Sequence, residues 1–181
     1  MAGCATESRH RLPAGSPVIV LPVFNATGTS LGLSRDERLG TLEAVLASET
    51  SDGPTVPELL QAGMLLALDA ADHKAATMAW TNSRFPGPYR SGQQARQAVE
   101  KAAVEGLVVW MALTAWDHTN WRERRAVTLS AEFVTFQPRQ AGSVEIRVVR
   151  HRRFLIPGTF SSLAQAVGDV GGQLIREGVG P

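Results

Sequence analysis

This sequence of 181 residues contains a single cysteine, carries little net charge and has no long apolar run. One cysteine excludes an internal disulfide bond. No segment approaches the roughly 18 apolar residues that a membrane-crossing helix needs. A net charge of +1 argues against bulk binding to nucleic acid. The hydrophobic content of 44% is enough for the core of one globular domain.

Patterns that bind metals or cofactors are also missing from the chain. Its four histidines have no ligand spacing, and there is neither a His-Glu-x-x-His pattern nor a pair of cysteines. No Walker loop and no Gly-x-Gly-x-x-Gly pattern is present. We therefore expect neither a metal nor a cofactor.

Apolar periodicity predicts one α/β domain over residues 17–181, after a polar segment at 1–16. Four periodic segments open with a capping box, in which a hydroxyl and a Glu or Gln three residues later satisfy the first amides of a helix. The four pairs are Ser34 and Glu37, Thr55 and Glu58, Ser91 and Gln94, and Ser162 and Gln165. Each pair predicts a helix start, the first of them for a helix at 35–48.

The strands are predicted to form a mixed sheet of about five strands. The segment 107–113 is apolar throughout, so we expect it at the centre of the sheet with both faces covered and with Trp110 in the core. The links at 117–125 and 137–142 are short, which favours an antiparallel meander followed by a C-terminal helix. The predicted order is β-α-α-β-α-β-β-β-α, with helices on one face and on part of the other. The predicted strands are 18–24, 74–80, 107–113, 127–133 and 144–148.

The first residues, Met1-Ala2-Gly3-Cys4, resemble the lipobox of bacterial lipoproteins, and a polar run follows them. The resemblance implies a signal peptide and a palmitate-bearing lipid anchor on Cys4, with residues 1–16 as lipobox remnant and flexible tether. A signal peptide has a charged start and an apolar stretch before the cleavage site, and neither precedes Met1. Two interpretations therefore stay open: a truncated start, or a free thiol near a frayed terminus.

Residues 18–177 resemble a group of bacterial envelope lipoproteins and related domains. The opening strand of that group has a sequence pattern that is matched here by Pro22, Phe24, Asn25 and Thr27. A later element of the group, in which a helix is followed by an acidic residue, a glycine and an apolar strand, is matched by residues 103–110. The group includes the penicillin-binding protein activator LpoB, the curli secretion lipoprotein CsgG and the amino-terminal domain of TolB. The resemblance implies a non-catalytic protein that binds protein partners. The helix predicted at 35–48 and the long loop at 81–90 depart from the pattern of the group.

Asn25 and Thr27 have a structural explanation that we prefer to a binding role. Their side chains can cap the backbone where a strand turns into a loop.

An enzymatic alternative comes from Gly28-Thr29-Ser30-Leu31-Gly32, which matches the nucleophile elbow of serine hydrolases. In that alternative Ser30 is the nucleophile, and Asp117 and His151 complete the triad. The elbow requires a strand directly before the serine, whereas the predicted strand ends at Phe24, several residues too early.

Three side chains are candidates for contact with a protein partner. Trp116 and Trp121 flank a polar hairpin loop, and Arg122 follows directly. Packing in the core or at its edge is an equally good explanation for the two tryptophans.

The resemblance and the short tether together predict where the protein acts. Ala5 rather than Asp follows the cysteine, which by the sorting habit of such lipoproteins implies the periplasmic side of the outer membrane. Residues 4–16 span at most about 40 Å even when fully extended. We therefore expect an envelope partner at or near the outer membrane in assembly or secretion, contact with the membrane through the lipid anchor alone, and a capacity to form homo-oligomers. A subunit without lipid remains a third hypothesis.

Overall fold

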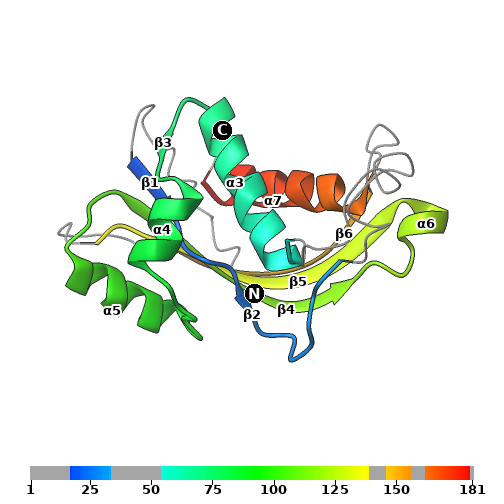
Figure 1. Cartoon of the computed structure of the whole chain (residues 1–181), viewed down its shortest axis with the longest axis horizontal. Coiled ribbons are helices and arrows are strands. Elements are labelled where there is room, and N and C mark those ends of the chain that lie inside the picture. The colour runs from blue at the N-terminus through cyan, green and yellow to red at the C-terminus, as the bar shows by residue number, and fades with distance from the viewer. Residues whose placement is uncertain (1–16, 34–53, 139–145, 156–161, 180–181) are drawn as a thin grey trace, which may run out of the picture.

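The computed structural model describes residues 17–33, 54–138, 146–155 and 162–179, and gives only the backbone for Arg122, for 146–155 and for 178–179. In these residues a six-stranded sheet has the order β3-β1-β4-β5-β6, with β2 also paired to β4. Figure 1 shows the strongly curved sheet, with α3 and α7 over one face and α5 on the other side, and α4 packs next to β1 and α3. The predicted α/β class and mixed sheet are confirmed.

The first half of the sheet is parallel. β1 (Pro17–Val20) lies between β3 (Lys74–Ala75) and β4 (Leu107–Asp117), and β2 (Phe24–Asn25) pairs with β4 further along. The sequence predicts one strand over 18–24, but the structure has two short ones separated by Pro22. Proline has no amide hydrogen to donate to a neighbouring strand, so the pairing is interrupted there.

The second half of the sheet is antiparallel. β4 pairs with β5 (Ala126–Phe136), and β5 pairs with β6 (Ile146–Leu155). A β-bulge interrupts the β4–β5 register between Leu113 and Ala115. The predicted antiparallel meander therefore describes only these last three strands, because β1, β2 and β3 all run parallel to their partners.

Two helices cover one face of the sheet. α3 (Val56–Ala70) and α7 (Leu163–Val179) pack on each other and on the sheet. The carboxylate of Glu58 accepts from the amide of Thr55 at 2.7 Å, which confirms this predicted helix start. The amide of Gln165 donates to the hydroxyl of Ser162 at 3.3 Å, which confirms the predicted start of α7.

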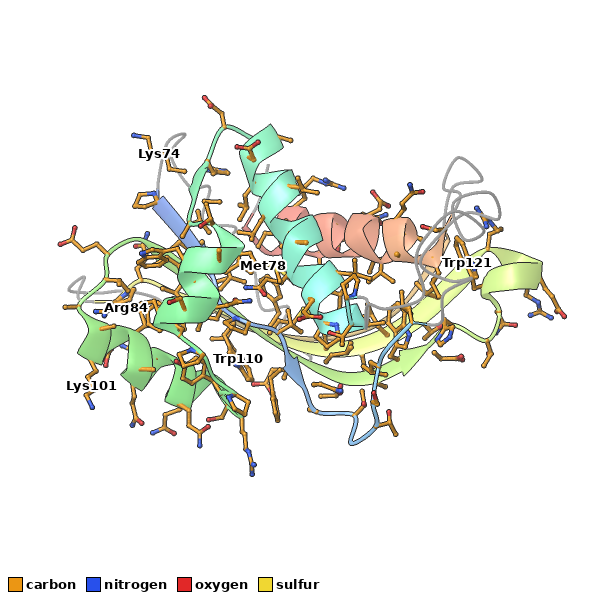
Figure 2. The ribbon with its side chains drawn as sticks, viewed as in Figure 1. Lys74, Met78, Arg84, Lys101, Trp110 and Trp121 are labelled. Atoms are coloured by element: carbon orange, nitrogen blue, oxygen red, sulfur yellow. The ribbon has the colours of Figure 1, made fainter. Side chains whose placement is uncertain are left out.

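The opposite face is covered by shorter elements. α5 (Gly92–Ala102) buries Ala95 and Val99 against the sheet, and α4 (Met78–Arg84) leads into the buried Phe85. Trp110 is 1% exposed, and its indole N–H donates to the carbonyl of Tyr89 at 3.0 Å. The prediction that Trp110 belongs to the core is confirmed, and Figure 2 shows it on the side of α5.

The predicted strand at 74–80 is wrong beyond its first two residues. After β3 the hydroxyl of Thr77 accepts from the amide of Trp80 at 3.3 Å and starts α4. The local capping interaction therefore outweighs the tendency of this apolar segment to extend. The helix predicted at 35–48, with its Ser34 and Glu37 box, lies outside the described residues.

Candidate partner-binding surface

A group of hydrogen-bonded polar side chains lies at the end of the sheet where β4 connects to β5. The connection between the two strands contains the short helix α6 (Trp121–Arg124), which projects from one end of the sheet in Figure 1. Thr114 and Ala115, at the bulge in β4, are both exposed. We call residues 114–125 the hairpin end.

Trp116 is held in place at the hairpin end. Its ring is half-buried against the core, and its indole N–H donates to Nδ1 of His118 at 3.0 Å. The two rings lie 6.1 Å apart between centroids, tilted by 32°. An indole that is packed on one side and fixed by a hydrogen bond loses little side-chain entropy when a partner binds to it.

Trp121 has a different environment. It is 6% exposed and belongs to the same core cluster as the buried residues of α3 and α7. The guanidinium of Arg125 lies 4.0 Å from the centroid of its ring, which is a cation–π contact. Little of the Trp121 ring is therefore left for a partner. The side chain of Arg122, the third predicted contact, lies outside the described residues.

Asp117 shapes the loop between β4 and α6. Its carboxylate accepts from the amide of Thr119 at 2.9 Å and from the hydroxyl of Thr119 at 2.8 Å. These two hydrogen bonds, the backbone one foremost, lower the pKa of Asp117 below its ordinary value of 3.8, and nearby His118 lowers that pKa further. The carboxylate thus fixes a turn instead of orienting a catalytic histidine.

A second polar loop begins beside β4. The amide of Ala26 donates to the carbonyl of Leu113 at 2.9 Å, which ties the loop after β2 to the bulged part of β4. Asn25 organises this loop: its amide nitrogen donates to the carbonyl of Thr29 at 2.8 Å, and its Oδ1 accepts from the amide and the hydroxyl of Thr27 at 3.1 and 2.7 Å. The structural explanation of Asn25 and Thr27 is confirmed.

The residues of the hydrolase alternative are distributed across the sheet. Ser30 is exposed, five residues after the end of β2. His151 is in β6, in register with Ser130 of β5. Three strand spacings, together about 14 Å, separate β2 from β6, whereas a nucleophile and its base must be about 3 Å apart. The sheet order does not bring the three predicted triad residues together.

A polar hollow of about 630 Å³ lies between α5 and β5. Arg96 and Glu100, paired at 2.9 Å, form part of its wall, and Glu132 of β5 forms another part. Within the described residues no group of three His, Cys, Asp or Glu side chains could hold a metal ion.

Sequence reasoning missed two features near β1. The buried amide of Gln61 donates to the carbonyl of Val20 at 3.0 Å and to Oδ1 of Asn82 at 2.9 Å, and so joins α3, β1 and α4. Trp80, predicted within a strand, is 45% exposed on α4 and makes an edge-on contact with Phe85. No sequence pattern marks Gln61, because its partners are 41 and 21 residues away along the chain.

Comparisons with known proteins give distant structural similarity. No family model matches the chain, and no curated protein matches it. Among solved structures, the hypothetical protein CT253 from Chlamydia trachomatis is 12% identical with a TM-score of 0.49, over 92% of this chain and 94% of that one. The lipoprotein GNA1162 from Neisseria meningitidis is 15% identical with a TM-score of 0.37, over 91% and 97%.

At these identities and TM-scores the similarity carries no argument about function. The resemblance to the group of LpoB, CsgG and TolB stays a prediction. Within the described residues no helix has the length and apolar character needed to cross a membrane. Cys4 lies outside the described residues.

Proposed function

We propose that this chain is a non-catalytic lipoprotein of the bacterial envelope, anchored through Cys4 to the periplasmic side of the outer membrane. The sequence Ala2-Gly3-Cys4 and the polar run that follows carry this proposal. The first described strand, β1, begins at Pro17, so a tether of residues 4–16 would have a reach of about 40 Å at most. The anchor would confine the domain to a layer next to the membrane and raise its effective concentration there.

The hairpin end is the part of the domain that we assign to binding a protein partner in envelope assembly or secretion. Trp116 supports this assignment because it is half-buried, fixed by His118 and placed on a protruding end of the sheet. Aromatic side chains held in this way are typical anchors of protein interfaces. The short tether favours a partner at or near the outer membrane.

The anchor is tested by mass spectrometry of the protein isolated from its native membrane fraction. We expect the mature chain to begin at Cys4 with a diacylglyceryl thioether and a fatty acyl group, and we expect no peptide containing Met1. Metabolic labelling with palmitate should mark the protein, and Cys4→Ser should remove the label. An unmodified Cys4 thiol in protein recovered from the cytosol would refute the anchor.

The partner surface is tested in cells by a photo-crosslinking amino acid placed at position 116. Position 101 on α5 serves as the matched control, because Lys101 is exposed on the other side of the sheet. We expect a discrete crosslinked product with an envelope protein at 116 and none at 101. Equal products at both positions, or none at either, would remove the assignment to the hairpin end while leaving the anchor untouched.

A further inference from the structure

An apolar groove runs along the outer side of α3 and α7, away from the sheet. It has a volume of about 800 Å³. Leu66 protrudes beside it with 71% of its surface exposed, more than any other large hydrophobic side chain among the described residues. The residues that line the groove include Leu66 and Ala67 of α3 and Gly168, Asp169, Gly172 and Arg176 of α7. Apolar surface of this kind, contiguous and bordered by polar side chains, marks an interaction site.

The two charged residues of the groove lie on the same side of α7. Asp169 and Arg176 are seven residues apart, which is two helical turns or about 10.5 Å along the axis. At this spacing they face the same direction. Within the described parts of the chain they form no ion pair with each other. The carboxylate of Asp169 accepts from the side-chain amide of Gln173.

Gly172 lies between these two charges and is nearly midway along the helix from each. A Cβ added at Gly172 would lie 3.3 Å from a guanidinium nitrogen of Arg176 and 3.3 Å from the Cβ of Ala67. The absence of a side chain therefore makes room for the Arg176 guanidinium inside the groove. At Gly168 an added Cβ would meet nothing within 4 Å, so the groove also has free space at this position.

We propose that this groove is the interface of a symmetric homodimer, in which α7 of one copy lies antiparallel across α7 of the other at Gly172. A two-fold axis at that point brings Asp169 of each copy to Arg176 of the other, which forms two equivalent ion pairs. The same operation sets the protruding Leu66 of each copy against the small residues of the opposite groove. A two-fold interface requires a self-complementary surface. Here one patch carries a protruding side chain, a groove that can receive it, and charges of both signs.

A second copy fits this patch better than an acyl chain does. A purely apolar ligand would bury Asp169 and Arg176 without compensating partners, which costs free energy. In the dimer both charges gain a partner when they lose water, and like charges stay apart.

Sedimentation of the full chain across a range of concentrations tests the proposal, with a reductant present so that a Cys4 disulfide cannot produce a dimer. We expect a reversible dimer for the unaltered protein. Asp169→Arg and Arg176→Asp should each weaken it by at least about tenfold in Kd, since each places like charges opposite one another. The double variant Asp169→Arg with Arg176→Asp should restore much of the affinity, because the pairs re-form with exchanged signs.

Two controls separate this interface from general effects on the fold. Lys101→Glu reverses an exposed charge on α5, on the other side of the sheet, and should leave the dimer unchanged. Leu66→Glu should give a folded monomer with an unchanged circular dichroism spectrum. A monomer at every concentration, a dimer that neither single reversal weakens, or a double variant no better than the singles overturns the proposal. A chain that dimerises only after residues 34–53 are deleted also overturns it and assigns the groove to that segment.

Discussion

At the scale of single residues, local hydrogen bonds decide what the polar side chains at the hairpin end do. Asp117 could be a triad member by its type and order in the sequence, yet its carboxylate is engaged by Thr119, two residues later. The side chain of Asn25 is likewise engaged by nearby backbone groups, those of Thr27 and Thr29 in the loop after β2. Short polar side chains satisfy nearby backbone amides more readily than they reach distant partners, because local bonds cost less chain entropy.

Replacing Thr119 by Val tests the role of Asp117. The substitution keeps the backbone amide and removes the hydroxyl, so the pKa of Asp117 should rise part of the way toward 3.8. Because the folded pKa is the lower one, the ionised carboxylate stabilises the fold above pH 3.8, and this contribution is lost as pH falls through the folded pKa. Carboxyl carbon NMR during a pH titration measures the shift. Thr114→Val, which removes a hydroxyl that donates to Ser130, is the control and should leave this pKa unchanged.

At the scale of elements, α3 and α7 pack so closely that their backbones are in contact. A Cβ at Gly63 would lie 1.8 Å from the carbonyl oxygen of Gly168, and one at Gly171 would lie 2.3 Å from that of Leu60. The backbones can approach in this way only because no side chain lies between them. These glycines set the distance between the two helices, and thereby the shape of the groove on their outer side.

Gly63→Ala should destabilise the domain by about 3 kcal/mol, because the new methyl group meets backbone atoms that cannot move without separating the helices. Urea unfolding at a concentration that keeps the protein monomeric measures this loss. Gly168→Ala is the matched control on the facing helix. With open space at its Cβ position, it should be neutral or should stabilise by about 0.5 to 1 kcal/mol through helix propensity. Equal effects at the two positions would contradict the packing argument.

At the scale of the whole molecule, strand order determines which residues can act together. β4 lies at the centre, with its parallel partners β1 and β2 on one side and its antiparallel partner β5 on the other. The strand before Ser30 and the strand that contains His151 are therefore on opposite sides of it. Among the described residues, the surfaces that we assign to partners are the protruding hairpin end and the outer groove of α3 and α7.

The sheet order predicts that the protein has no serine-hydrolase activity. A fluorophosphonate probe incubated with the folded, full chain should give no labelling above that of Ser30→Ala, because the sheet order separates β2, the strand before Ser30, from the strand of the predicted base His151 by about 14 Å. Labelling that depends on Ser30 and is lost in His151→Ala would show that the two residues meet, and would replace the non-catalytic proposal with the enzymatic one.

The sequence by itself determined the features that depend on neighbours along the chain. It predicted the helix starts at Thr55, Ser91 and Ser162, the buried central strand with Trp110, and the loop-capping role of Asn25. Each follows from periodicity or from hydrogen bonds that span a few residues, and such interactions are local.

Only the tertiary structure decided the features that depend on distant residues. It set the parallel pairing of β1 and β3, the burial of Trp121, the link from Gln61 to Val20 and the contact of Gly63 with Gly168. These depend on which elements become neighbours in space, and that is settled by the burial of apolar faces across the whole chain. One apolar face is compatible with several partners, so periodicity cannot say which of them it meets.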